Sequence, residues 1–216
     1  MNRDAGQAFP LYITAVAALL LLALAFFAVG RAGAAKNGTQ TAADAAALAA
    51  AQDYRDQLRT GFLTTVLRAA GPDGKGGDGK GGDGKGADWA GWLAGRGADR
   101  ERACRAAAAY AATNSAQPDV TCEEGEAPGS FRVRVTSART VGPSVVPGTE
   151  NRHATASAEA VVTPRCAPRA AAPAGDAAKP APPLTLTCDG EDVTVDPARP
   201  GTLVPAAELF TVRLTD

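Results

Sequence analysis

The sequence predicts an α+β protein. An N-terminal transmembrane helix continues into an alanine-rich helix, and a small extracytoplasmic domain follows in which a helix packs on an antiparallel β-sheet. Three observations predict this class. An uncharged apolar run, Phe9–Val29, lies near the N-terminus, and strong helix formers follow it. Beyond residue 120, apolar and polar residues alternate with the period of two that is typical of strands.

The apolar run predicts a membrane anchor at residues 9–29, behind a short cytoplasmic leader at residues 1–8. Its length as a helix is about 31 Å, which matches the hydrocarbon core of a bilayer. A cleaved signal peptide is the alternative, and the small residues from Ala32 to Ala35 could serve a signal peptidase. Signal peptides usually have a shorter apolar region and a basic leader, so we expect a retained anchor.

The cysteines and the basic residues favour opposite orientations of this anchor. Arg31 and Lys36 follow the apolar run, which favours a cytoplasmic C-terminal side. The four cysteines lie in the C-terminal part of the chain, and an even number there favours disulfides in an oxidising compartment. We therefore predict a single-pass protein of the cell membrane with a cytoplasmic N-terminus and an extracytoplasmic C-terminal domain. The predicted bridges join cysteines that are neighbours in sequence: Cys104–Cys122 and Cys166–Cys188.

Residues 30–70 predict an alanine-rich extracytoplasmic helix that continues from the anchor. Gly30, Gly33 and Gly38 predict a soft point at the junction, since glycine weakens a helix by about 1 kcal/mol relative to alanine. Ala42, Ala46 and Ala49 form a face of small side chains, which permits close approach of another helix. We expect this face to pack against another subunit in a homo- or hetero-oligomer. A stalk without a partner is the alternative.

Residues 71–87 contain a repeated pentapeptide that begins at Asp73, Asp78 and Asp83. Its glycine content predicts a flexible linker, which would separate the helix mechanically from a domain at residues 88–216. The order of residues in the repeat matches a dinucleotide-binding motif and the start of a P-loop, but the structural context that these motifs need is missing. Gly81 stands where a P-loop needs Ser or Thr, and no strand precedes either motif.

The domain at residues 88–216 begins with a helical stretch and continues with strands. Residues 89–115 predict helix in one or two pieces. The alternating segments predict strands of an antiparallel sheet with one buried face; these are residues 120–122, 131–135, 154–160, 184–188, 193–195 and 210–214. Asp189-Gly190 predicts a hairpin turn. Residues 164–183, rich in Pro and Ala, predict an irregular loop.

The composition argues against several classes of function. A net charge of −1 gives no electrostatic case for nucleic-acid binding. His153 is the only histidine, no cysteine pair has CxxC spacing, and common catalytic motifs are missing. We therefore predict a protein that is not an enzyme and that has no catalytic residue, no metal and no other cofactor.

The N-terminal segment resembles a known family. Asp4-Ala5-Gly6-Gln7-Ala8-Phe9-Pro10-Leu11, the apolar run, and then Gln40-Thr41-Ala42-Ala43-Asp44 with the alanines up to Ala51 resemble tight-adherence (Flp-type) pilus-assembly proteins of the TadE/TadG kind. The segment is most similar to the TadG-like N-terminal segment found in actinobacteria. The resemblance covers about residues 4–52. It implies a membrane-anchored, pilin-like structural or accessory component of a Tad/Flp-type pilus assembly or secretion system, with other proteins of that apparatus as partners.

The same resemblance implies a processing site, from which this chain departs in one respect. Pilin-like members are cut by a prepilin peptidase after a glycine, which here would be the bond between Gly6 and Gln7. They carry a glutamate at the fifth mature position, where this chain has Leu11. The alternative function is a signal-anchored or secreted binding module, stapled by disulfides and without a role in a pilus.

Overall fold

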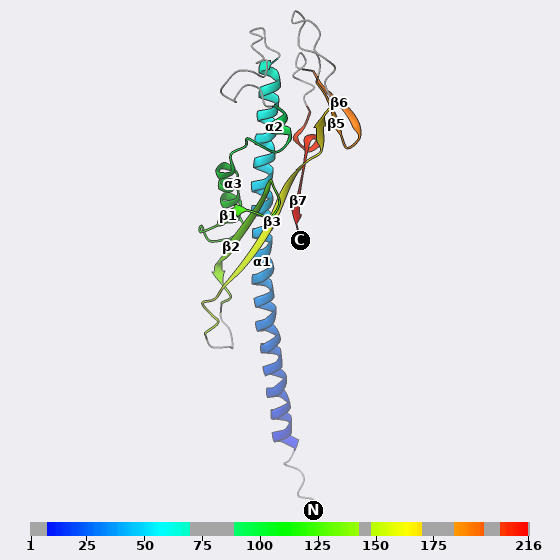
Figure 1. The fold of residues 1–216 in the computed structure, drawn as a ribbon. Coiled ribbons are helices and arrows are strands. Elements are labelled where there is room, and N and C mark those ends of the chain that lie inside the picture. The colour runs from blue at the N-terminus through cyan, green and yellow to red at the C-terminus, as the bar shows by residue number, and fades with distance from the viewer. Residues whose placement is uncertain (1–7, 70–88, 143–147, 170–183, 197–203, 216) are drawn as a thin grey trace, which may run out of the picture.

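One long helix organises the fold. The computed structural model describes residues 8–69, 89–142, 148–169, 184–196 and 204–215. Helix α1, Ala8–Ala69, is 62 residues long, and the short helices α2, Trp89–Leu93, and α3, Arg100–Thr113, follow it. The N-terminal half of α1 projects away from the rest of the protein, and its C-terminal half runs through the body of the fold (Figure 1). The helix continues without interruption through Gly30, Gly33 and Gly38, where the sequence predicts a soft point.

Two antiparallel sheets lie beside the C-terminal half of α1. The larger has the strand order β1-β2-β3-β7, with β1 at Thr121–Glu124, β2 at Ser130–Thr140, β3 at His153–Pro164 and β7 at Phe210–Thr215. The smaller has the order β4-β5-β6, with β4 at Cys166–Pro168, β5 at Leu184–Cys188 and β6 at Glu191–Val195. A short helix, α4 at Ala206–Leu209, precedes β7.

The core forms where α1 meets the larger sheet and α3. Phe131, Val133 and Val135 alternate along β2 and are buried, as a strand with one covered face requires. Ala103, Ala107 and Ala111 recur every four residues on α3 and are fully buried, so α3 can approach α1 closely. Tyr54 of α1 meets Phe131 edge to face, with 5.2 Å between the ring centroids.

The structure therefore contradicts the prediction that residues 88–216 form a mechanically separate domain. A single hydrophobic cluster contains α1 side chains from Ala42 to Val66 together with side chains of α3 and of both sheets. Without α1, the apolar face of the larger sheet would lose its main cover. The predicted linker, residues 71–87, lies outside the described residues.

Two disulfides join neighbouring elements, in the pairs that the sequence predicts. Cys104–Cys122 links α3 to β1 with 5.7 Å between the Cα atoms. Cys166–Cys188 links β4 to β5, where the two residues are paired in the ladder with 4.0 Å between the Cα atoms. Each bridge holds an edge strand, β1 or β4, to a neighbouring element.

The strands differ from the prediction in two places. The sequence predicts one sheet, but the strands divide into two. The predicted irregular loop, residues 164–183, contains strand β4, so that prediction is wrong at residues 166–168; residues 170–183 lie outside the described residues. The hairpin between β5 and β6 is confirmed: Asp189 and Gly190 have φ values of 49° and 92°, as a two-residue turn of this kind needs.

Candidate functional site

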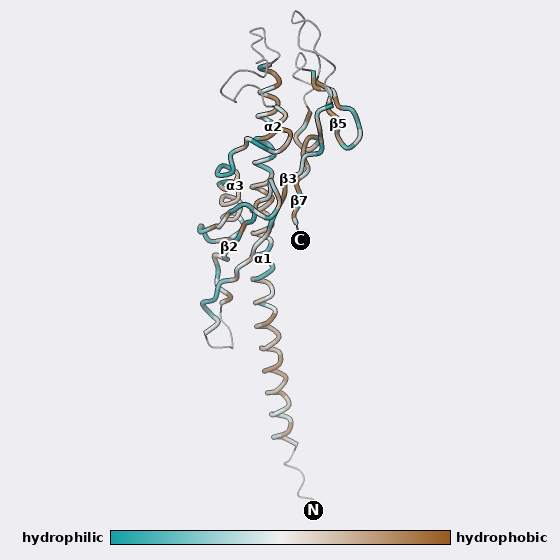
Figure 2. The backbone as a smooth tube through the Cα atoms, in the orientation of Figure 1, coloured by the Kyte–Doolittle hydropathy of each residue, from teal (hydrophilic) through white to brown (hydrophobic). Residues whose placement is uncertain are grey.

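The most unusual surface of the protein is the exposed apolar half of α1. An 18-residue window of this helix has a mean hydropathy of 2.6, and none of it is buried. Large side chains such as Leu20 and Phe26 are 61% and 76% exposed. Figure 2 shows that this apolar stretch extends from the body of the fold as a single helix; we call this exposed part of α1, Phe9–Val29, the rod. By length and composition α1 is a candidate membrane anchor.

The sequence explains why this half is one uninterrupted helix. Leucine and alanine dominate it, and both are strong helix formers. Pro10 lies in the first helical turn, where no intrahelical donor is lost. The hydroxyl of Thr14 donates to the carbonyl oxygen of Leu11 at 2.9 Å, so this polar group is satisfied within the helix. The rod therefore presents an apolar surface to its surroundings on all sides.

The change from exposed rod to buried core takes place between Arg31 and Ala42. Arg31 is the first charged residue after the apolar run, and its guanidinium carbon lies 5.8 Å from the ring centroid of Phe27. Thr39 is only 4% exposed, and its hydroxyl donates to the carbonyl oxygen of Ala35 at 2.7 Å. Ala42 is 1% exposed and begins the core. The change from exposed to buried side chains thus takes about three helical turns.

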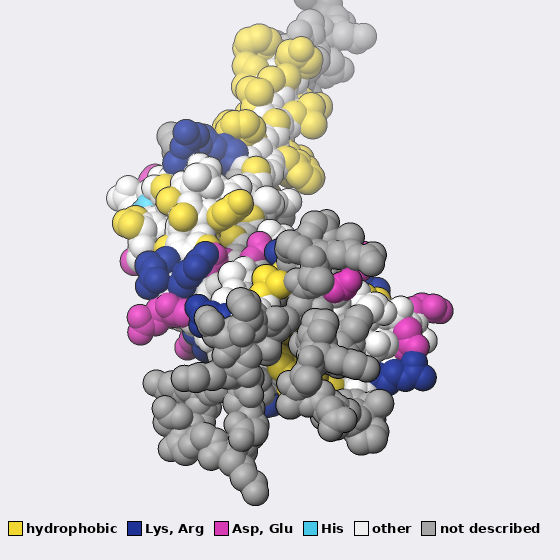
Figure 3. All heavy atoms as spheres, turned by 90° about the horizontal axis from the view of Figure 1, so that it is seen from above, with side chains coloured by type: hydrophobic (Ala, Val, Ile, Leu, Met, Phe, Trp, Pro, Cys, Tyr) yellow, Lys and Arg dark blue, Asp and Glu magenta, His cyan; other side chains and the backbone are white. Residues whose placement is uncertain are grey.

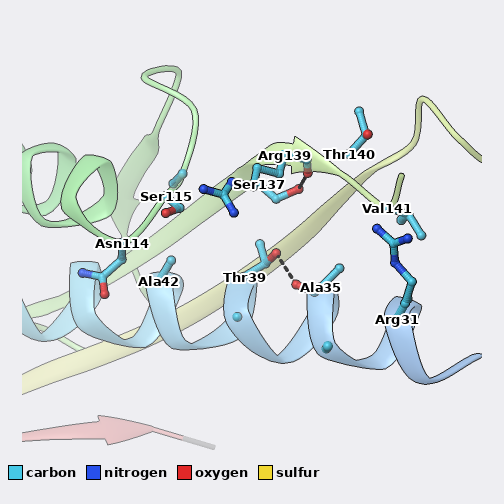
Figure 4. Close-up of a pocket in the computed structure, with 13 residues that line it drawn as sticks. Arg31, Ala35, Thr39, Ala42, Asn114, Ser115, Ser137, Arg139, Thr140 and Val141 are labelled. Carbon is cyan, nitrogen blue, oxygen red and sulfur yellow. Dashed lines mark hydrogen bonds between the residues drawn. The ribbon is translucent and has the colours of Figure 1, made fainter. Parts of the chain in front are cut away.

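A cleft of about 470 Å³ lies at this transition. Its walls are α1 from Arg31 to Ala42, the segment Asn114–Ala116 that follows α3, and the end of β2 from Ser137 to Thr140 together with Val141 (Figure 4). Arg31 and Arg139 stand on opposite walls, and the hydroxyl of Ser137 donates to the carbonyl oxygen of Arg139 at 2.7 Å. No Asp or Glu occurs among the described residues that line the cleft.

The predicted helix-packing face lies inside the protein. Ala42, Ala46 and Ala49 are 1%, 0% and 6% exposed, because β2, β3 and α3 of the same chain cover them. The small side chains do permit close packing, but the elements that use it belong to this chain. The expectation that this face contacts another subunit is therefore corrected, since it packs against elements of the same chain.

The predicted processing site lies outside the described residues, since the structure describes α1 from Ala8 onward. Cleavage between Gly6 and Gln7 therefore stays a prediction. Leu11, which stands in place of the glutamate that the family resemblance implies, is 73% exposed on α1. The apolar stretch of α1 up to Val29 has no acidic side chain that could pair with a neighbouring amino terminus.

The charged groups of the sheet join its strands. The guanidinium of Arg132 on β2 lies 2.9 Å from Glu159 on β3 and 3.0 Å from Glu126. Burial raises the pKa of Glu159, but hydrogen bonds from Ser130, the backbone of Glu126 and Arg132 outweigh it, so this pKa is lower than usual. The cluster holds β2 against β3 and against the turn before β2.

A second arginine covers the core at the same end of the sheet. The guanidinium carbon of Arg100 lies 4.9 Å from the ring centroid of Phe131 and 5.6 Å from that of Tyr54. Its Nη2 donates to Glu124 at 2.5 Å. Burial raises the pKa of Tyr54, whose hydroxyl donates to the carbonyl oxygen of Gly95 at 2.9 Å. These contacts tie α1, α3 and β1 together.

Within the described parts of the chain, no group of three or more His, Cys, Asp or Glu side chains could hold a metal ion. Nδ1 of His153 lies 2.7 Å from the carbonyl oxygen of Ser137, at the start of β3. This histidine therefore joins two strand ends.

The cleft and its two arginines are not predicted from the sequence. In the sequence, Arg31 is used only to predict the orientation of the anchor, and no pattern marks Arg139 as a functional residue. A signal for Arg31 does exist, since it is the first charge after the apolar run. Nothing in the sequence places Arg139, about a hundred residues later, opposite to it.

The comparison with protein families supports the resemblance seen in the sequence. Residues 6–53 match the family model of TadE/G-like proteins for Flp pilus assembly, named Tad. The match confirms the resemblance over the apolar half of α1 and the alanine-rich start of its buried half. Searches among curated proteins and among solved structures find no match.

Proposed function

We propose that this protein is a membrane-anchored, pilin-like structural or accessory component of a Tad/Flp-type pilus assembly or secretion system, and that it is not an enzyme. The family match over residues 6–53 supports a role related to Tad pilus assembly. The observation that carries the proposal is the continuity of α1. The matched segment is at once the exposed apolar rod and the beginning of the core.

The exposed half of α1 is the surface through which the protein acts in this proposal. An apolar rod of about 31 Å in contact with water would be strongly unfavourable, and both a bilayer and apolar partner helices can cover it. Leu11 in place of the glutamate removes the charge with which pilin-like members pair inside a filament. An accessory or assembly role therefore fits better than that of the main filament subunit. Oligomerisation, homo- or hetero-, uses the side chains of Phe9–Val29.

The proposed topology places the N-terminus in the cytoplasm and the folded body outside. Both disulfides lie in the body and need an oxidising compartment. Arg31 and Lys36 are the first two basic residues after the anchor in the sequence, and the preference of such residues for the cytoplasm is statistical. An enzyme reporter that is active only outside the cytoplasm, fused after Asp216, tests this topology; an inactive reporter on a stable fusion would contradict it.

Photocrosslinking from the membrane-spanning segment tests the pilus role. A photoreactive amino acid replaces Leu20, which is exposed on the rod, and in a separate variant it replaces Glu101, which is exposed on α3. We expect adducts with membrane proteins of the Tad apparatus from Leu20, because the rod is the proposed contact surface. Adducts with lipid alone from Leu20, together with unchanged pilus formation after deletion of the gene, would refute the proposal. The tethered binding module would then remain.

A further inference from the structure

The cleft lined by Arg31 and Arg139 lies at the end of the apolar run and is positively charged, and the pilus role explains neither its position nor its charge. Val29 ends the apolar run, and Arg31 lies two residues, or about 3 Å of helix, beyond it. The headgroup layer of a bilayer begins at this level and extends for about 5–8 Å on each side of the hydrocarbon core. If the proposed anchor spans the membrane, the mouth of the cleft therefore lies among lipid headgroups.

The geometry points to a binding site for the headgroup of an anionic phospholipid in the leaflet from which α1 emerges. This inference rests on the membrane anchor of the proposed function and is independent of the pilus role. The occupant would place its phosphate at the guanidinium of Arg31, at the mouth of the cleft, and its polar headgroup would extend into the cleft toward Arg139. Its acyl chains would stay on the membrane side of Arg31, beside the apolar half of α1.

Charge complementarity supports this occupant. Arg31 and Arg139 line the cleft, no carboxylate does so among the described lining residues, and neither arginine takes part in a salt bridge found in the described structure. Arg31 lies at the membrane end of the cleft and the guanidinium of Arg139 lies beside Ser115 (Figure 4), so both ends of the cleft carry positive charge, which suits an anionic headgroup. Figure 3 shows Lys and Arg side chains gathered on the body beside the point where the apolar helix leaves it.

The arginine on the helix is held in position by its neighbours. Its guanidinium lies over the ring of Phe27 on the membrane side. On the other side it packs against the backbone of Gly142, where a Cβ atom would lie only 2.7 Å from Nη2 of Arg31. Gly142 has φ +79°, a conformation that favours glycine. The side chain is thus directed along the wall of the cleft, between the rod and the end of β2.

The shape and the polarity of the remaining wall also fit a lipid. Ala34, Ala35 and Val141 supply apolar surface next to Arg31, and Ser115 lies at the other end of the cleft (Figure 4). The carbon atoms of a headgroup can lie against the apolar surface while its polar atoms meet the arginine and hydroxyl groups. A volume of about 470 Å³ holds a phosphoglycerol group together with its glycerol backbone.

Hydrogen exchange of the full-length protein in nanodiscs tests the inference. The amides of residues 137–142 are followed while phosphatidylglycerol is titrated into phosphatidylcholine. We expect these amides to become protected as the anionic lipid is added. Substitution of both arginines, R31Q/R139Q, should raise the lipid fraction that gives half-maximal protection by about 30-fold, or about fivefold for each charge. Unchanged thermal unfolding of this variant shows that its fold is intact.

A matched variant separates the cleft from general attraction to a charged surface. K36Q/R152Q removes two exposed charges from the same end of the body, next to the cleft but outside its lining. We expect this variant to shift the half-maximal fraction by less than about fivefold. Equal shifts in the two double variants would overturn the inference, because the preference would then depend only on charge near the membrane.

Two further outcomes would also overturn it. Inorganic phosphate, added to phosphatidylcholine nanodiscs at the same phosphate concentration, should not protect residues 137–142; if it does, the cleft binds a free anion and not a lipid. A protein that does not float with phosphatidylcholine vesicles lacks the anchor, and this result would refute the proposed function as well. Normal flotation without any protection by phosphatidylglycerol would refute the lipid site alone.

Discussion

Gly61 offers a sharp test of how α1 is packed, because helix propensity and packing predict opposite effects for one substitution. A Cβ atom on Gly61 would lie 2.4 Å from Cε3 of Trp92 and 2.5 Å from Cδ2 and Cζ3. Carbon atoms in contact normally lie about 3.5–4.0 Å apart, so the ring would have to move by about 1 Å. Gly97 borders the same ring from another position, where a Cβ atom would lie 3.2 Å from Cη2 of Trp92, and this limits the movement.

The two contributions to the free energy of unfolding can be compared directly. Alanine in place of a helix-interior glycine gains about 1 kcal/mol from propensity. Forcing an extra methyl group into packed surroundings costs about 1–3 kcal/mol. Because the ring of Trp92 is confined, we expect the cost to lie in the upper half of this range. Gly61→Ala should therefore destabilise the protein by about 1–2 kcal/mol.

Unfolding in guanidinium, followed by tryptophan fluorescence of the full chain in detergent, measures this change. Gly33→Ala is the matched control, since no atom lies within 4 Å of a Cβ at that position, and it should leave stability equal or higher by up to about 1 kcal/mol. In a Trp92→Leu background, the penalty of Gly61→Ala should largely vanish. A gain in stability from Gly61→Ala equal to that from Gly33→Ala would refute the packing described here.

Three further predictions test the core, a bridge and a carboxylate. Ala46→Leu should lower the free energy of unfolding by about 1–3 kcal/mol, because Ala46 is fully buried, while Ala18→Leu on the exposed rod should not; equal effects in urea unfolding would contradict this. Replacing both Cys104 and Cys122 by serine should cost about 2–4 kcal/mol, and thermal unfolding that matches the parent would show the bridge to be dispensable. The lowered pKa of Glu159 stabilises the fold above the ordinary glutamate pKa, and this contribution is lost as the pH falls through the folded pKa. Glu159→Gln should therefore flatten the loss of stability in acid, and an unchanged pH profile would rule out this linkage.

Local patterns predict the elements of this fold well. The apolar run and the alanines that follow indicate a helix, and α1 spans them from Ala8 to Ala69. The alternation around Phe131 and Val133 predicts β2, and Asp189-Gly190 predicts the turn between β5 and β6. Each of these signals depends on residues that are close together in the chain, so a single sequence contains them.

The partners of each element could not be predicted in the same way. Ala46 has the same small side chain whether it meets a second subunit or β3 of its own chain, and only the tertiary structure shows the latter. The cleft could not be predicted for the same reason, since Arg31 and Arg139 line one cleft only when the end of β2 is placed beside α1. The glycine-rich repeat suggests two independent parts. The core shows instead that residues after the repeat pack against the helix that precedes it.

The absence of a break in α1 fixes the rotational position of the body about the helix axis. Each helical residue turns the chain by about 100°, so the side chain of Leu20 and the cleft at Arg31 keep a constant angular relation. A single residue inserted between Val29 and Thr39 would turn the body by about 100° relative to the apolar half of α1 and lift it by about 1.5 Å. In the proposed function, partners that contact this half of α1 would thereby set which side of the body faces the next molecule.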